Sequence, residues 1–328
     1  MSTAEFAELG TAVEPAVEPF QTTRAQRWAL VRRIALAAWV VGLLAYTFGI
    51  GIPVQRELVM GWICAGLAAG SIGRSPREIV LLLRDWVPLA LILVVYDLSR
   101  GIADQLGTPV HMTAMIDVDR FLFFGQTPTE WLQAELIDLE RVRWWEVSFT
   151  IVYISHFIVP FAVAGALWAR ARDAFHQFSR RFVVLSFFGL ATYVAFPAAP
   201  PWLAGEEGLL EGVHRTTARG WQVIDVGTAY AFQKGQATVN LVAAVPSLHA
   251  AFAALVAMFL WPRVRPVWRP LLALYAVAMG FALVATGEHY VFDILLGWLY
   301  AAGVIVGCSW WERRRAVSPA AIADRAPA

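Results

Sequence analysis

Charge is scarce in this chain. Asp, Glu, Lys and Arg make up 16% of its 328 residues, whereas hydrophobic side chains make up 59%. A soluble domain of this size carries more charge and less apolar surface. The formal net charge of +1 argues against a nucleic-acid partner, which would need a basic stripe. We therefore expect an integral membrane protein whose main partner is the bilayer and which binds no nucleic acid.

Cysteine is scarce as well, and the N-terminal segment has none of the features of a leader. The two cysteines, Cys64 and Cys308, both fall inside apolar runs, which argues against a structural disulfide. The N-terminal segment lacks the basic start and apolar core of a signal peptide. We predict disordered tails at residues 1–27 and 313–328, where the composition offers little to bury. Between them, residues 28–312 are expected to form one membrane-embedded domain.

Long apolar runs fill this domain. A membrane-crossing helix needs about 20 apolar residues, and this criterion predicts an all-α polytopic protein with about eight transmembrane helices. Their expected ranges are 33–52, 57–73, 86–106, 144–169, 181–198, 246–261, 269–287 and 290–311. Residues 107–143 instead mix acids with aromatic and aliphatic side chains, which indicates helices lying along the membrane surface.

Arginine is distributed unevenly over the predicted loops. Alternate loops, counted from the N-terminal one, hold most of the positive charge, with clusters at residues 24–33, 170–181, 263–269 and 313–315. Loops that carry an excess of Lys and Arg stay in the cytoplasm. We therefore expect a multi-pass protein of the cell membrane with both termini in the cytoplasm.

Two histidines stand at the beginning of long apolar runs. His249 belongs to the stretch 243–251, and His289 belongs to the stretch 287–293. A helix start gathers unpaired backbone N–H groups and the positive end of the helix dipole, so each stretch predicts an anion site. Two apolar runs joined by a short loop separate the histidines, and both are therefore expected on the extracytoplasmic side.

The neighbours of these histidines indicate acid–base and nucleophilic chemistry. His289 and Asp293 are four residues apart, so on a helix the carboxylate can orient one ring nitrogen and leave the other free to attack. Pro246 suits a first helical turn, and Ser247 offers either a cap oxygen or a hydroxyl for a phosphate. His249 is then placed to give a proton to a leaving group.

These elements resemble a known family. Pro-Ser-x-His at 246–249 followed by His-x-x-x-Asp at 289–293 is similar to the type-2 phosphatidic acid phosphatase superfamily of membrane enzymes. Phe-Pro-Ala-Ala-Pro-Pro-Trp at 196–202 makes the chain resemble the inositol phosphorylceramide synthase branch, whose members are lipid phosphotransferases. Residues 117–133 also look like a segment of that branch. The resemblance covers residues 75–305 and implies a six-helix core with extra helices on the N-terminal side.

The resemblance implies a role for each of three residues. His289 would form a phosphohistidine, Asp293 would orient it, and His249 would be the general acid, with no metal or organic cofactor required. The implied substrate is a phosphate-bearing lipid that enters from the outer leaflet. The implied reaction is phosphoinositol-type transfer to an alcohol.

Further residues are expected to contact the substrate. Pro246 and Ser247 lie at the helix start, while Leu248, Tyr290 and Trp202 make the mouth apolar, which disfavours water as acceptor. The superfamily's phosphatases carry a Ser-Arg pair at positions where this chain has Ala-Leu. The phosphate-binding cations are therefore expected in the outer loops, where the candidates are Arg120, Arg215, Arg219 and Lys234.

Other interpretations stay open. Water could replace the alcohol, which would make the protein a phosphatase for a phosphatidic-acid or polyprenyl-phosphate type lipid. His249, His289 and Asp293 could instead bind a metal ion. A lipid transporter is a further alternative, although the matching Gly/Pro-broken halves expected of one are missing. His156 lies in mid-span, where a hydrogen-bonded bundle residue is the expected role.

Overall fold

The computed structural model describes residues 23–50, 56–105, 108–224 and 241–317. Within these ranges the regular structure is helical, apart from two isolated β-bridges. The long helices are α1 (Arg24–Gly49), α2 (Arg56–Ser71), α3 (Pro76–Gln105), α6 (Trp144–Arg170), α7 (Arg172–Ala195), α11 (Leu248–Leu260), α12 (Arg269–Ala285) and α13 (Val291–Val317). The short ones are α4 (Ala114–Leu122), α5 (Pro128–Leu136), α8 (Pro201–Glu206), α9 (Gly220–Ile224) and the 3-10 turn η1 (Pro266–Trp268).

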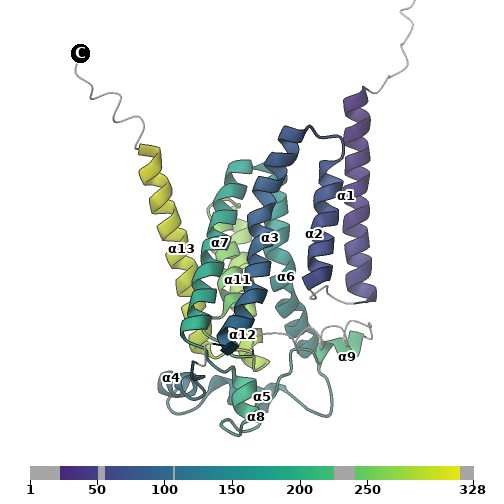
Figure 1. Cartoon of the computed structure of the whole chain (residues 1–328). Helices are drawn as coiled ribbons and strands as arrows, with labels where there is room; N and C mark the ends of the chain where they lie inside the picture. The colour runs from purple at the N-terminus through teal and green to yellow at the C-terminus, as the bar shows by residue number, and fades with distance from the viewer. Residues whose placement is uncertain (1–22, 51–55, 106–107, 225–240, 318–328) are drawn as a thin grey trace, which may run out of the picture.

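The long helices run side by side, and the short helices α4, α5, α8 and α9 gather at one end of them (Figure 1). The start of α1 and the end of α13 are both at the opposite end, on opposite sides of the bundle. This arrangement agrees with the expectation that both ends of the chain lie on the same side of the membrane. The bundle thus has one end with the short helices α4, α5, α8 and α9, and an opposite end with the start of α1 and the end of α13.

The prediction of an all-α polytopic membrane protein is confirmed. Each of the eight expected segments coincides with a long helix, and five helices in the described ranges are long and apolar enough to cross a membrane: α1, α6, α7, α13 and α12 with its leading turn. The apolar helices Gly61–Ser71 and α11 are shorter. α3 is not among these five helices, and its first part carries four charged residues: Arg77, Glu78, Arg84 and Asp85.

Two helices reach into the segments that the sequence predicted to be tails. α1 begins at Arg24 because Thr23 caps it, its hydroxyl accepting from the Gln26 N–H at 3.3 Å. α13 continues to Val317. The remaining parts of the predicted tails, residues 1–22 and 318–328, lie outside the described residues, as do residues 225–240.

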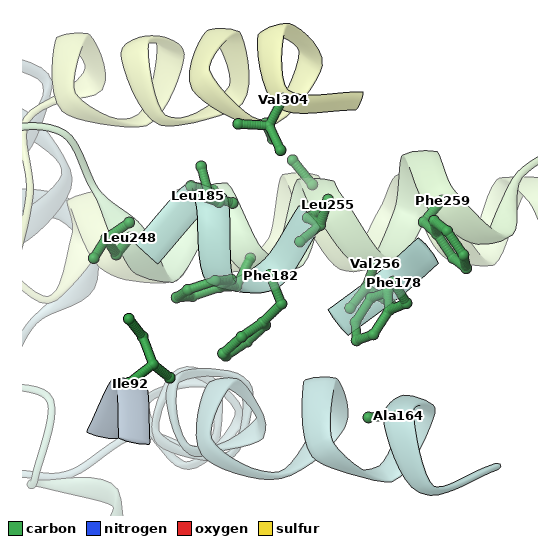
Figure 2. Packing of buried hydrophobic residues seen from close by; sticks show 14 of the residues in the cluster. Ile92, Ala164, Phe178, Phe182, Leu185, Leu248, Leu255, Val256, Phe259 and Val304 are labelled. Carbon is green, nitrogen blue, oxygen red and sulfur yellow. The ribbon is translucent and has the colours of Figure 1, made fainter. Parts of the chain in front are cut away.

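The core is built around α11, which packs against α13, α12, α6 and α7. Figure 2 shows Leu255 and Phe259 of α11 among Phe178, Phe182 and Val304 from the neighbouring helices. Ten of the thirteen residues of α11 are buried. By contrast, α1 buries no residue, and its main packing partner is α2. A helix that is apolar on every side is expected at the centre of a bundle, so the short length of α11 is consistent with its central place.

Candidate active site

The starts of α11 and α13 lie against each other. Ser247 caps α11, its hydroxyl accepting from the Ala250 N–H at 3.3 Å, and its own N–H donates to the Asp293 carbonyl at 3.1 Å. Gly297 makes this approach possible, because a Cβ there would lie 2.5 Å from the Ser247 carbonyl oxygen. The two histidine motifs are therefore joined by a backbone contact at one end of the bundle.

His289, Asp293 and His249 meet at this contact. The Nδ1 atom of His289 lies 3.4 Å from Oδ2 of Asp293, and both side chains are buried. The imidazole rings of His289 and His249 have centroids 5.7 Å apart. The distance of 3.4 Å is longer than an ordinary hydrogen bond, and such contacts tighten when substrate is bound. With Nδ1 facing the carboxylate, Nε2 of His289 is left for a reacting atom.

A third histidine joins the pair. The ring of His156 on α6 lies 4.2 Å from the ring of His249, and the ring of Tyr153 stacks on His249 at 4.8 Å. Within the described ranges, Nδ1 of His156 and Nε2 of His249 are buried and have no hydrogen-bond partner. Sequence reasoning gave His156 a bundle role. The spacing of Tyr153 and His156, one helical turn apart, was the available signal that both face the site.

The start of α13 is already occupied by carboxylates. The two oxygens of Asp119 on α4 accept the N–H groups of Val291 and Phe292, each at 3.0 Å, and Oδ2 of Asp293 accepts the Tyr290 N–H at 2.9 Å. The prediction of an anion site at this helix start therefore needs correction, because the protein supplies the anion itself. Burial raises the pKa of Asp119 to about 6, although both N–H bonds favour the charged form.

The start of α11 differs. Its cap is the neutral hydroxyl of Ser247 and its first turn holds no acid. In the described part of the chain, no carboxylate bonds to its first amides. Of the two helix starts, α11 is therefore the one with no carboxylate on its first amides among the described residues.

Arg215 is the predicted cation that the structure brings to the site. Its Nε and Nη2 atoms donate to the two oxygens of Glu288 at 2.8 and 3.1 Å, and its guanidinium lies 4.8 Å from the ring centroid of Trp202. Thr217 donates to the same carboxylate. Burial acts to lower the pKa of Arg215, but Glu288 outweighs it and the pKa is raised. The guanidinium is thus held in place directly beside the residue that precedes His289.

Arg219, another candidate cation, has a different acidic partner. Nε of Arg219 contacts Glu146 at 2.8 Å, at the start of α6, so this side chain braces a loop. Arg120 is on α4, next to Asp119. Lys234 lies outside the described residues. The choice among the outer cations depends on tertiary partners, which the sequence does not reveal.

The segment Phe196–Trp202 connects the two motifs. Its Ala198 pairs with His111 on one side and with Ala243 on the other, and Ala243 leads into the start of α11. The Trp202 N–H donates to the Gly287 carbonyl at 2.9 Å. The segment follows the end of α7 and contacts both the residues before His249 and those before His289.

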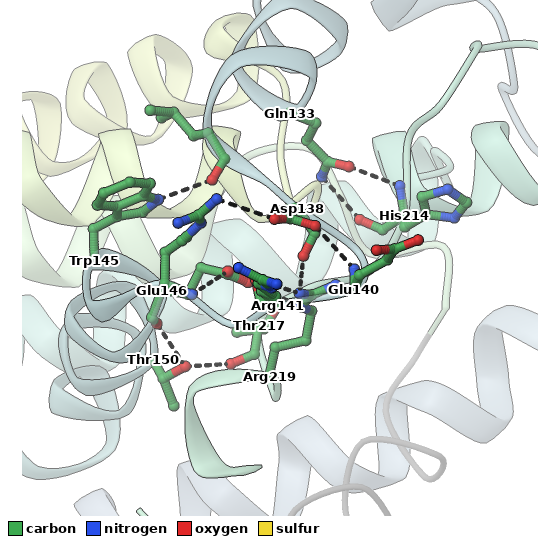
Figure 3. Close-up of polar contacts among 12 residues, drawn as sticks. Gln133, Asp138, Glu140, Arg141, Trp145, Glu146, Thr150, His214, Thr217 and Arg219 are labelled. Carbon is green, nitrogen blue, oxygen red and sulfur yellow. Dashed lines mark hydrogen bonds and ion pairs between the residues drawn. The ribbon is translucent and has the colours of Figure 1, made fainter. Parts of the chain in front are cut away.

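The segment 117–133 braces the same region from outside. Besides Asp119, its Gln133 exchanges two hydrogen bonds with the backbone of His214, at 2.8 and 2.9 Å (Figure 3). Figure 3 also shows Arg219 at the Asp138 carbonyl and Thr150 bonded to the Thr217 carbonyl at 2.8 Å. These bonds hold the loop that carries Arg215.

Three further predicted contacts are packing residues in the structure. Leu248 fills the space over Gly189, where a Cβ would lie 2.5 Å from its Cδ2 atom. Tyr290 is fully buried in the cluster with Met115. The Pro246 carbonyl accepts the Tyr193 hydroxyl at 2.9 Å. Both side chains are buried, Leu248 as the first residue of α11 and Tyr290 directly before the first residue of α13.

Among the described residues, no group of three or more His, Cys, Asp and Glu side chains is arranged to hold a metal ion.

The family model of the PAP2 superfamily, named for the type-2 phosphatidic acid phosphatases, matches residues 113–307. This range covers more than half of the chain and contains His249, His289 and Asp293. The chain belongs to the PAP2 superfamily. It is thus a membrane enzyme of this superfamily, as the motifs predicted.

Two curated relatives make the likeness more specific. The PAP2 chain is 27% identical to the phosphoinositol dihydroceramide synthase of Bacteroides thetaiotaomicron over 229 residues, 64% of this chain and 71% of the relative. It is 28% identical to the inositol phosphorylceramide synthase catalytic subunit aur1 of Schizosaccharomyces pombe over 149 residues, 44% of this chain and 35% of the relative. No solved structure matches the chain.

Proposed function

We propose that this PAP2-superfamily enzyme transfers a phosphoryl-linked head group, of the phosphoinositol type, from a donor lipid to the hydroxyl of an acceptor lipid. The observation that carries the proposal is the pairing of two histidine rings 5.7 Å apart, one of them 3.4 Å from a buried carboxylate. The names of the two relatives support the phosphoinositol group and a ceramide-type acceptor.

In the first step, Nε2 of His289 attacks phosphorus and the bond to the donor's lipid oxygen breaks. The imidazolium that results is stabilised by the Asp293 carboxylate on its Nδ1–H side. His249 gives its proton to the departing oxygen, which leaves as the alcohol of the donor lipid. A single tetrahedral group between two rings at this separation can contact both of them.

In the second step the direction of proton transfer reverses. His249, now neutral, takes the proton of the acceptor hydroxyl, the oxygen attacks phosphorus, and the bond to His289 breaks. Each step forms one bond and breaks one bond at phosphorus, and the proton on His249 is restored. No oxidant, reductant or further co-reactant is consumed.

The charge of the transferred group is met by Arg215 and by the start of α11. Arg215 is fixed by Glu288 and Trp202, and a pre-positioned guanidinium matches phosphate oxygens in two-point contacts. The neutral Ser247 cap leaves the helix dipole of α11 available to the same oxygens. The lipid chains of the substrate remain in the bilayer beside the bundle.

The proposed topology has eight crossings, with both termini in the cytoplasm and the histidines on the extracytoplasmic face of the cell membrane. Single cysteines at Glu207 and Arg314, both exposed and at opposite ends of the chain's bundle, test it. An impermeant thiol reagent should label only the Glu207 position in intact cells. Labelling of both positions from outside would contradict the eight crossings.

The reaction itself is tested with purified protein and a donor lipid labelled in its phosphoinositol group. The label should move to an added ceramide-type acceptor and stay on the donor when the acceptor is omitted. If free phosphoinositol accumulates at one rate with and without acceptor, the enzyme is a hydrolase and the transfer proposal is wrong.

A further inference from the structure

We propose that Asp119 is a positioning residue of this reaction, which keeps the Asp293 carboxylate available to His289 by satisfying the first amides of α13. The inference rests on the proposed roles of His289 and Asp293. It gives a function to part of the segment 117–133. The sequence alone showed that this segment resembles the family branch, but not what it does.

Three consecutive amides at the start of α13 need acceptors. Tyr290 N–H is taken by Oδ2 of Asp293, whereas Val291 and Phe292 N–H are taken by the two oxygens of Asp119. Asp119 is fully buried and belongs to a different helix, α4. The two carboxylates therefore divide the amides between them.

This division matters because Asp293 has two tasks. Its Oδ2 atom both caps Tyr290 and faces Nδ1 of His289, and its Oδ1 atom has no hydrogen-bond partner in the described part of the chain. Buried amides left without an acceptor draw any oxygen within reach. Without Asp119, the amides of Val291 and Phe292 compete for the Asp293 carboxylate and turn it away from the histidine ring.

Asp119 also determines where substrate phosphate does not bind. Its negative charge cancels the positive end of α13, so a phosphoryl group gains nothing by moving to the amides beneath the nucleophile. The group is left to the start of α11 and Arg215, from which side Nε2 of His289 can reach it.

The test is a double-mutant cycle on the transfer reaction. Asp119→Ala should lower kcat by about 10²-fold, as expected for a small misplacement of a reacting group, with KM changed by less than about threefold. Asp119→Asn keeps one of the two acceptor oxygens and should lose about tenfold. Asp117→Asn, an exposed acid on the same helix, is the matched control and should leave kcat unchanged.

The cycle is closed in the Asp293→Asn background. There, Asp119→Asn should lower kcat by less than about threefold, because residues that act through one another are not additive. A purely structural Asp119 would reduce kcat by the same factor in both backgrounds, and this result would overturn the inference. If Asp119→Ala shows no thermal unfolding transition, Asp119→Asn alone completes the cycle.

One further variant separates this inference from the proposed function. If His289→Ala keeps full activity, the assignment of the nucleophile is wrong and the inference on Asp119 fails with it. If His289→Ala is inactive while the cycle is additive, the nucleophile stands and only the positioning role of Asp119 is refuted.

Discussion

The starts of α11 and α13 carry similar sequence motifs and have opposite electrostatics. α11 begins with the neutral cap of Ser247 and has no acid in its first turn. α13 begins with three amides bonded to the carboxylates of Asp119 and Asp293. A histidine at a helix start is therefore not enough to define an anion site. This difference supports the proposal that substrate phosphate binds at the start of α11 and that the nucleophile lies at the start of α13.

The largest effects should come from the histidines, and they should differ between the two helix starts. His289→Ala should remove essentially all turnover, because a nucleophile has no substitute. His249→Ala should cost about 10²–10⁴-fold with an ordinary lipid leaving group, the usual contribution of general acid catalysis. With a donor whose leaving group needs no proton, the loss for His249→Ala should largely disappear in single-turnover measurements.

His176→Ala serves as the control for this comparison, because His176 lies on α7 beside Asp85, far along the chain from both motifs. Its kcat should stay within about twofold of the parent enzyme. Equal sensitivity of His249→Ala and His289→Ala to every leaving group would show that the two residues do not have separate roles.

A smaller effect is expected for Arg215, the cation held by Glu288 beside His289. Arg215→Gln should lower kcat/KM by about 10–100-fold, the range for hydrogen bonds to a charged group. Arg219→Gln is the matched comparison, since Arg219 contacts buried Glu146 instead. It should lower the unfolding temperature, as removal of one partner of a buried ion pair does, with less change in kcat/KM for the folded enzyme. The reverse ranking in kcat/KM would move the phosphate site to Arg219.

The smallest effect concerns the cap of α11. Ser247→Ala removes the hydroxyl that accepts the Ala250 N–H, and a lost cap costs about 1 kcal/mol of stability. KM and kcat should change by less than about threefold, because the hydroxyl is engaged by its own helix. A loss of more than about 100-fold in kcat/KM, without loss of stability, would show that Ser247 binds phosphate directly.

The parts of the fold that could be predicted are those written locally in the sequence. Long apolar runs define helices wherever they fall, so the expected segments coincide with the long helices. The sequence predicted His289 beside Asp293 on one helix face, and the two side chains do lie close. The reason differs, however, because α13 begins at Val291 and the Asp293 side chain reaches back from its first turn to His289. The contact between the histidines follows from two crossings that return the chain to one side.

The parts that could not be predicted depend on contacts between distant segments. Asp119 bonds to Val291 across 172 residues, and nothing in the local pattern of α4 indicates this partner. Arg215 and Arg219 are equally plausible from spacing, and only their acidic partners, Glu288 and Glu146, distinguish them. Tyr290 was assigned to the mouth because of its place in a motif, whereas burial places it in the core.

The covalent intermediate gives the most direct test of the central claim, that His289 carries the transferred group. The enzyme is incubated briefly with donor lipid labelled in its head-group phosphate, quenched in alkali, digested and mapped by mass spectrometry. The account predicts an acid-labile label on the peptide that contains His289, absent from His289→Ala and lost on addition of the acceptor lipid as labelled product appears. Turnover with no label on that peptide, or with label on His249 instead, would contradict the account.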